Sequence, residues 1–328
     1  MKTLKNNLKA ILLTGLAFAS CSKNDDDNNI PVIEDLTGIE IVSYNDIQGF
    51  FDENGVEKQD FILDGTAGGT IVAENGTQIN FYANSFVDGN GDPITGDVDV
   101  SIKEIFNASE MILSNKPTNA INELDENTFL LSEGETEVFV SQNGDEVFLA
   151  PGYSYQITVP SAGGEDFDML PFSGTTSDEE GIVWETNNFG DNGGIYYDAV
   201  APATYIYNAF DIGWTNCDKF YSYPGDKTTN YMNLSDSPNA TETVIYLVFK
   251  ENNLPAVVKF TTPYTNGIQS YEDMLPVGLD VTYVAITINN NQQYMAVQDV
   301  TIATEEELTL NFEPKTTQEI IDALEMLD

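Results

Sequence analysis

Apolar and polar residues alternate with a period of two along much of this chain. In Asp97–Lys103, the side chains of Val98, Val100 and Ile102 fall on one face and polar side chains fall on the other. Such alternation is typical of a strand with one buried face and one face in water. The same pattern predicts further strands at Thr70–Ala73, Gln78–Tyr82, Glu137–Ser141, Val147–Leu149, Tyr153–Val159, Tyr205–Phe210, Val244–Phe249, Val257–Thr261, Val281–Ile288 and Leu308–Phe312.

Two of the strand pairs are joined by Asn-Gly turns, at Asn75-Gly76 and at Asn143-Gly144. Asn-Gly between alternating strands is a strong signal for a tight hairpin, because both turn residues must accept a positive φ. Many short strands joined by such turns favour an antiparallel sandwich.

The end of the chain changes to a helical pattern. Thr316 and Glu319 have capping-box spacing, and the apolar side chains that follow share one face of a helix. We therefore expect a short C-terminal helix.

A polar stretch divides the strand pattern into two parts. Residues 161–195 are rich in Gly, Ser, Asp, Glu and Asn, and we expect one strand there, at Gly181–Glu185. The predicted fold is all-β, with two antiparallel β-sandwich domains in tandem and the short C-terminal helix. The first sandwich would span residues 39–160, the connecting segment 161–195 and the second sandwich 196–328.

The first residues of the chain have the layout of a secretory signal peptide. Three lysines precede the apolar run Ala10–Ala19, which is about half as long as a membrane span requires. Ala19-Ser20-Cys21 resembles a bacterial lipobox, which implies that the signal peptide covers residues 1–20 and that Cys21 carries the lipid. Residues 21–38 are polar and acidic and would form a disordered tether.

The residues after Cys21 indicate where the protein is displayed. The run Ser22–Asp27, a lysine followed by aspartates, resembles the surface-export signal of Bacteroidota lipoproteins. That resemblance implies lipid anchoring in the outer membrane with the protein facing the cell exterior. The inner leaflet of the same membrane stays open as the alternative.

Charge and composition exclude several classes of function. The chain has 54 acidic and 12 basic residues and a net charge of −42, so it lacks the basic surface that nucleic-acid binding needs. It contains no histidine, which excludes Ser-His-Asp and Cys-His catalysis in their usual form and the common catalytic zinc sites. We therefore expect a protein that is not an enzyme, with catalysis by carboxylates alone left open.

The segment from Gly68 to Val98 carries a glycine entry, a hairpin and a Gly-Asn-Gly-Asp-Pro turn. It resembles a segment of uncharacterised Bacteroidota surface lipoproteins and, more loosely, the opening of ZU5-type β-sandwich domains. Gly213–Phe220 is similar to a second segment of the same lipoproteins. Such domains are interaction modules, so the resemblance implies binding and transfers no catalytic residue.

One turn has the ligand spacing of a calcium loop. Asp88, Asn90 and Asp92 stand at positions 1, 3 and 5, and Asp99 stands at position 12. The sixth position is Pro93 in place of glycine, and a strand follows in place of a helix. Turn geometry alone also favours Asp and Asn at such positions. We expect no cofactor, unless this loop holds calcium.

Aromatic residues suggest a ligand-binding surface in the second half of the chain. Exposed Tyr and Trp beside polar groups are suited to stack on sugar rings, whereas Tyr is also common in strands for packing reasons. The candidate ligand-binding residues are Trp214, Tyr205, Tyr207, Tyr221 and Tyr223. Cys217 stands among them, and we expect it to pack in the core rather than to act as a nucleophile.

Three hypotheses for function follow. The first is a surface-anchored binding or adhesion module for a glycan or a protein, attached to the membrane through its lipid alone. The second is a glycan hydrolase that uses two carboxylates, at the separations that retaining or inverting enzymes require. The third is a structural component of the cell envelope that acts through protein partners.

Overall fold

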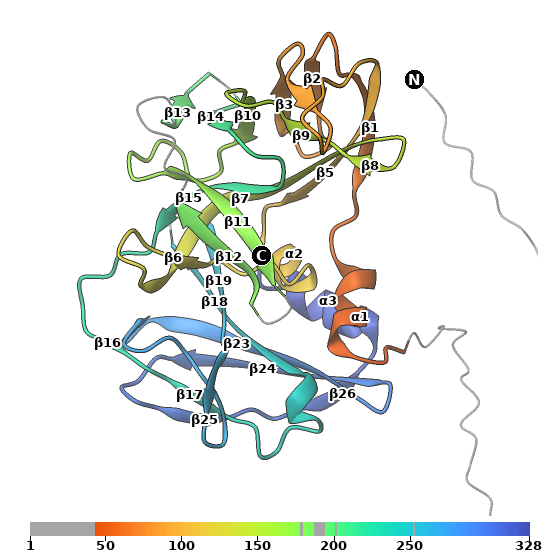
Figure 1. Cartoon of the computed structure of the whole chain (residues 1–328). Helices are drawn as coiled ribbons and strands as arrows, with labels where there is room; N and C mark the ends of the chain where they lie inside the picture. Colours follow the sequence, from red (N-terminus) through yellow and green to blue (C-terminus); the bar gives the residue numbers. More distant parts are fainter. Residues whose placement is uncertain (1–42, 178–179, 187–193, 201, 252) are drawn as a thin grey trace, which may run out of the picture. The chain divides into compact units, whose positions relative to one another are not determined.

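The computed structural model describes residues 43–177, 180–186, 194–200, 202–251 and 253–328. The chain is built from strands, with a short C-terminal helix, as the alternation predicted (Figure 1). The described residues from 43 onward form one compact unit. The predicted signal peptide, Cys21 and the tether of residues 21–38 lie outside the described residues. None of the described helices is long and apolar enough to cross a membrane.

An eight-stranded sheet forms the centre of the N-terminal half. Its order is β1-β5-β7-β15-β11-β12-β6, and β8 is added at the end of β7. The strands are β1 (Gln59–Asp64), β5 (Asp97–Ile105), β6 (Asn119–Ile121), β7 (Asn127–Gln142), β8 (Asp145–Glu146), β11 (Leu170–Ser177), β12 (Gly181–Thr186) and β15 (Trp214–Phe220). Because β6 pairs with both β12 and β7, part of the sheet closes on itself.

A five-stranded antiparallel sheet packs on the eight-stranded one. Its order is β13-β14-β10-β3-β2. The strands are β2 (Gly69–Val72), β3 (Gln78–Phe81), β10 (Tyr155–Pro160), β13 (Tyr196–Asp198) and β14 (Thr204–Ala209). Alternate apolar side chains of the two sheets, such as Ile79 and Val100, meet in one buried cluster, which is the arrangement expected of a sandwich. The short pair β4 (Phe86–Val87) and β9 (Phe148–Leu149) lies beside it.

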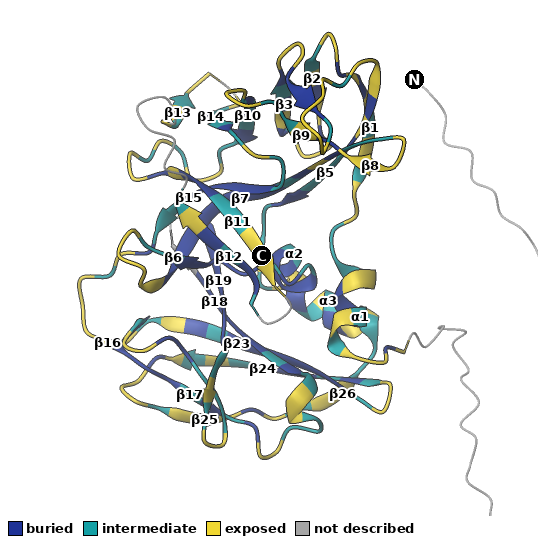
Figure 2. Ribbon diagram, in the orientation of Figure 1, coloured by how far each residue is buried: buried dark blue, intermediate teal, exposed yellow. Residues whose placement is uncertain are grey.

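The C-terminal half is built around a second five-stranded sheet, with the order β19-β18-β23-β24-β26. The strands are β18 (Thr243–Glu251), β19 (Leu254–Lys259), β23 (Asp280–Asn289), β24 (Gln292–Thr301) and β26 (Glu313–Lys315). Both faces are buried along its central strands, as Figure 2 shows for β23. The remaining strands are the pair β16 (Lys227–Thr228) and β22 (Leu275–Pro276), and the four-stranded sheet of β17 (Tyr231–Asn233), β20 (Thr262–Tyr264), β21 (Gly267–Gln269) and β25 (Glu307–Thr309).

Three α-helices are described, and a 3₁₀ turn, η2 (Ala240–Glu242), precedes β18. They are α1 (Ile47–Asn54), α2 (Ala108–Leu113) and α3 (Thr317–Glu325). The α3 helix begins at the predicted capping box, in which the Thr316 hydroxyl accepts from the Glu319 amide and the Glu319 carboxylate accepts from the Thr316 amide. Its buried side chains, Ile320 and Leu324, join a core cluster with residues of α1 and α2.

The alternation identified most strands and both hairpin turns, but the predicted connecting segment was wrong. Residues 161–195 contribute β11 and β12, which lie inside the eight-stranded sheet. Gly174 explains part of this position, because a Cβ there would press against Ile182 and Trp184. A polar and glycine-rich composition therefore marks closely packed strands here, not a linker.

The predicted division into sandwiches at residues 160 and 196 also differs from the structure. The strands β14 and β15 belong to the N-terminal sheets, so the change from one set of sheets to the other falls between β15 and β16. The halves are also joined by hydrogen bonds, since the Thr118 amide donates to the Val257 carbonyl at 2.7 Å and the Lys259 amide donates to Asn119 Oδ1 at 2.8 Å. Both core clusters contain residues of both halves.

Candidate functional site

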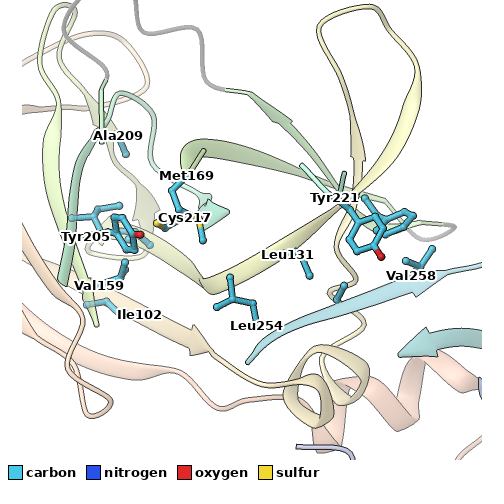
Figure 3. Packing of buried hydrophobic residues seen from close by; sticks show 14 of the residues in the cluster. Ile102, Leu131, Val159, Met169, Tyr205, Ala209, Cys217, Tyr221, Leu254 and Val258 are labelled. Atoms are coloured by element: carbon cyan, nitrogen blue, oxygen red, sulfur yellow. The ribbon is translucent and has the colours of Figure 1, made fainter. Parts of the chain in front are cut away.

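Three of the tyrosines that suggested a sugar-binding surface lie in the core. Tyr205 is fully buried and Tyr207 and Tyr221 are nearly so. The Tyr205 hydroxyl donates to the Gly164 carbonyl at 2.6 Å and accepts from the Asp166 amide at 2.7 Å. The prediction of an exposed tyrosine face was therefore wrong at these positions, because all three side chains belong to a buried apolar cluster, in which Figure 3 shows Tyr205 and Tyr221.

The other two aromatic candidates differ in exposure, since Tyr223 is half-buried and Trp214 is buried. The Tyr223 hydroxyl donates to the Val277 carbonyl at 3.1 Å, so its polar end serves a loop of the C-terminal half. Trp214 begins β15 and is 8% exposed. Its ring meets Trp184 edge-on at 6.4 Å between centroids, and the Lys116 ammonium lies 5.3 Å from the Trp214 centroid.

Cys217 packs in the core, which was the expected role. Its side chain lies among Tyr205, Met169 and other apolar residues, with no exposed surface (Figure 3). Burial raises the pKa of the Cys217 thiol well above its ordinary value, and the nearby Asp218 acts in the same direction. A thiol in that setting is a poor nucleophile.

The candidate calcium loop uses its carboxylate to hold its own turn. Asp88 Oδ1 accepts from the amides of Asn90 and Asp92, both at 2.9 Å. These hydrogen bonds, the one from Asp92 first, lower the pKa of the Asp88 carboxyl. Asp99 lies on β5, where it pairs with Ile62 and Ser141. Within the described ranges, no group of three or more His, Cys, Asp or Glu side chains is arranged to hold a metal.

A polar groove of about 710 Å³ opens beside Trp214, and it is the strongest candidate for a binding site. Its walls come from α1 and the loop after it, the end of α2, the β11–β12 hairpin, and β5, β7 and β15. The lining residues are Gln48, Phe51, Asp52, Glu53, Gly55, Val56, Glu57, Lys58, Lys103, Ser114, Asn115, Lys116, Glu137, Thr176, Ser177, Gly181 and Trp214.

Hydrogen bonds fix the walls of this groove. The Val56 amide donates to Ser114 Oγ at 3.0 Å, which ties the loop after α1 to the end of α2. Asn115 Oδ1 accepts from the Tyr246 hydroxyl at 2.8 Å in the core. Gly181 has a positive φ of 80°, and a Cβ there would overlap the carbonyl oxygen of Asn115, so the hairpin can approach this closely only with glycine. A preformed groove of this kind is typical of a ligand site.

Three lysines give the groove its chemical character. Lys58 is exposed and its ammonium lies 5.4 Å from the centroid of Phe139, whereas Lys103 and Lys116 are half-buried. Among the residues that the structure describes, none of the three has a carboxylate oxygen within the 4.0 Å that defines an ion pair. The nearest acidic residue in the sheet pairing is Glu137 on β7, which lies directly opposite Lys103 on β5. Burial lowers the pKa of Lys116, and Lys103 acts in the same direction.

Two buried carboxyl groups lie on the strands that continue inward from the groove. Glu135 on β7 and Asp218 on β15 have no exposed surface. In the pairing of these two strands, Glu135 lies opposite Asn216 and Asp218 lies opposite Ser132. Neither oxygen of Glu135 has a hydrogen-bond partner within the described part of the chain. Burial, and after it the charge of Asp218, raises the pKa of Glu135 well above its ordinary value.

Two other buried carboxylates serve the backbone. Glu104 accepts from the amides of Asn75 and Thr77, at 2.9 and 3.0 Å. Glu133 accepts from the amides of Ala162 and Gly163, at 2.6 and 3.0 Å. Each carboxylate accepts hydrogen bonds from loop amides that have no strand partner, so the burial of these two carboxylates has a structural explanation.

A second open groove, of about 850 Å³, lies between the β6–β7 turn and β20–β21 and is lined in part by Tyr221, Tyr271 and Lys227. It has fewer cations than the first groove. The lysines of the first groove were missed by sequence reasoning because Lys58, Lys103 and Lys116 are far apart along the chain. The scarcity of lysine was the one signal that could have drawn attention to them.

No protein-family model matches the chain, and the curated proteins contain no match to it. The assignment of function therefore depends on the chemistry of the groove.

Proposed function

We propose that this protein is a lipid-anchored binding protein of the bacterial cell envelope that holds a polar ligand in the groove beside Trp214 without altering it. The observation that carries the proposal is the groove itself, with its fixed walls, its polar lining and Trp214 among its lining residues. Anchoring through Cys21 and display at the cell surface are part of the proposal, supported by the resemblance of residues 19–27 to lipoprotein signals.

A glycan is the ligand class that this lining favours. Carboxylates such as Glu137 accept hydrogen bonds from sugar hydroxyls, and ammonium groups such as that of Lys103 donate to sugar oxygens. Hydroxyl and amide groups from Ser114, Thr176 and Asn115 supply further partners. An apolar ligand would leave these groups without partners, at a cost of about 1–3 kcal/mol for each buried one.

The experiment that tests the proposal measures retention and reaction together. The purified protein is passed over a panel of immobilised cell-surface and plant polysaccharides, and the eluted glycans are assayed for new reducing ends. We expect retention on one class of polysaccharide with no products. New reducing ends would contradict the proposal and favour catalysis by a pair of carboxylates.

A steric variant connects retention with the groove. Thr176 is exposed on β11 and lines the groove, so Thr176→Trp should fill part of it and abolish retention. Ser235 is also exposed and lies outside the lining residues, so Ser235→Trp is the matched control and should be retained like the wild type. Equal retention of both variants would place binding elsewhere. Absence of retention on every glycan would favour a role through protein partners.

A further inference from the structure

The concentration of lysines at the groove is unusual for this chain. Only eight lysines follow residue 42, namely Lys58, Lys103, Lys116, Lys219, Lys227, Lys250, Lys259 and Lys315, and the first three line the groove. Elsewhere, Lys219 forms an ion pair with Asp166 at 2.9 Å and Lys315 forms one with Glu313 at 3.2 Å. The groove lysines are without such a partner in the described ranges, in a protein with abundant carboxylates.

Burial lowers the pKa of Lys116, and within the described residues no carboxylate oxygen lies within ion-pair distance of its ammonium. Its ammonium lies over the Trp214 ring, an interaction that favours the charged form. Glu135 and Glu137 lie close enough to raise the pKa of Lys116, and burial raises the pKa of the Glu135 carboxyl well above its ordinary value. Lys103 is near enough to disfavour the charge on Lys116. Two cations that repel each other in a partly desolvated site are stabilised by an anion placed between them.

The carboxylates of the groove limit which anion can enter. Asp52, Glu53 and Glu57 are exposed at its rim and Glu137 is half-buried beside Lys103. An inorganic anion without a proton, such as sulfate, would be repelled by these four carboxylates and has no hydrogen-bond donor to offer them. A ligand that carries both an anionic group and several hydroxyl donors can satisfy the lysines and the carboxylates together.

We infer that the ligand of the groove is an acidic saccharide, whose anionic group binds between Lys103 and Lys116 while its hydroxyls donate to Glu137 and the rim carboxylates. This inference rests on the proposed function and adds the chemical class of the ligand. The anionic group is the carboxylate of a uronic acid or the sulfate ester of a sulfated sugar, since both present oxygen acceptors to ammonium donors.

The test measures affinity by isothermal titration calorimetry with four defined tetrasaccharides. They are an oligogalacturonate, its carboxyl-reduced neutral form, a sulfated oligogalactan and its desulfated form. One acidic member of a pair should bind at least tenfold more tightly than its neutral form, because a charge-assisted hydrogen bond is worth that factor or more. Which acidic member binds distinguishes uronate from sulfate.

Lysine variants locate the effect. Lys103→Gln should lower the affinity for the acidic tetrasaccharide about tenfold and lower that for the neutral form by a smaller factor. Lys58→Gln, at an exposed position, repeats the test without a risk to folding and should also weaken acidic binding. Lys227→Gln is the matched control, because Lys227 is exposed and lines the second groove. It should bind like the wild type.

The outcomes separate this inference from the proposed function. Equal affinity for acidic and neutral forms, with no effect of Lys103→Gln, would overturn the acidic-saccharide inference and leave glycan binding in place. An equal loss in Lys103→Gln and Lys227→Gln would also overturn it, because general attraction of anions would then explain the binding. No binding of any tetrasaccharide, together with no retention on the polysaccharide panel, would overturn both.

Discussion

The buried carboxyl group of Glu135 makes the stability of this protein depend on pH in a defined direction. Glu135 is enclosed between Ile105 on β5 and Asn216 on β15, and its oxygens lack hydrogen-bond partners within the described residues. Because burial raises its pKa in the folded protein, the folded state binds the proton more tightly than the unfolded chain does. The contribution of Glu135 to the free energy of unfolding is therefore largest below the unfolded-state pKa, and it falls as the pH rises towards the folded-state pKa.

The magnitude follows from linkage. For each pH unit between the two pKa values, one such group lowers the free energy of unfolding by about 1.4 kcal/mol. Glu135→Gln keeps the shape and removes the ionisation. From pH 5 to pH 7 the stability of the variant relative to the wild type should therefore rise, by up to about 1.4 kcal/mol for each pH unit that lies below the folded-state pKa.

Urea unfolding at pH 5, 6 and 7, followed by tryptophan fluorescence, measures the difference between variant and wild type. Taking the difference cancels the titration of the other carboxylates, apart from Asp218, which titrates together with Glu135. Glu185→Gln, at an exposed position on β12, is the control and should give a difference that does not change with pH. A constant difference for Glu135→Gln as well would refute the reasoning.

Three further predictions concern stability and reactivity. Tyr205→Phe removes the hydroxyl that links the Gly164 carbonyl and the Asp166 amide, and it should lower the free energy of unfolding by about 1–3 kcal/mol in urea titrations. The control is Tyr196→Phe, at a site 63% exposed, for which the difference should be near zero. In a Cys21→Ser background the Cys217 thiol should react with an aromatic disulfide reagent only after denaturant is added, and rapid labelling of the native protein would contradict its burial. Thr316→Ala should cost about 1 kcal/mol in the same urea titrations by removing the cap of α3, and an unchanged midpoint would show that the capping box contributes little.

Local signals in the sequence were sufficient for the strand character, the hairpins and the last helix. Alternation along Asp97–Lys103 identified β5 because the side chains of a strand point to opposite faces, whatever the strand pairs with. The turn at Asn75-Gly76 and the capping box at Thr316 depend on neighbours within four residues. Each of these features is determined over a few residues, so the sequence alone is enough to find them.

Pairing between distant strands could not be found in this way. The polar composition of residues 161–195 gave the wrong prediction because β11 and β12 are held by neighbours far along the chain, and Gly174 is needed there to make room for Trp184. The burial of Tyr205 likewise depends on a second sheet that packs over it. Composition reports the average environment of a segment and does not say which surface will cover it.

The candidate site shows the same division. The sequence by itself determined the overall acidity, the absence of histidine and the few lysines. Only the tertiary structure decided that Lys58, Lys103 and Lys116 lie around one groove, with Trp214 beside them. The physical reason is that each lysine comes from a different element, and the distance between such elements is determined by sheet pairing and core packing rather than by separation along the chain.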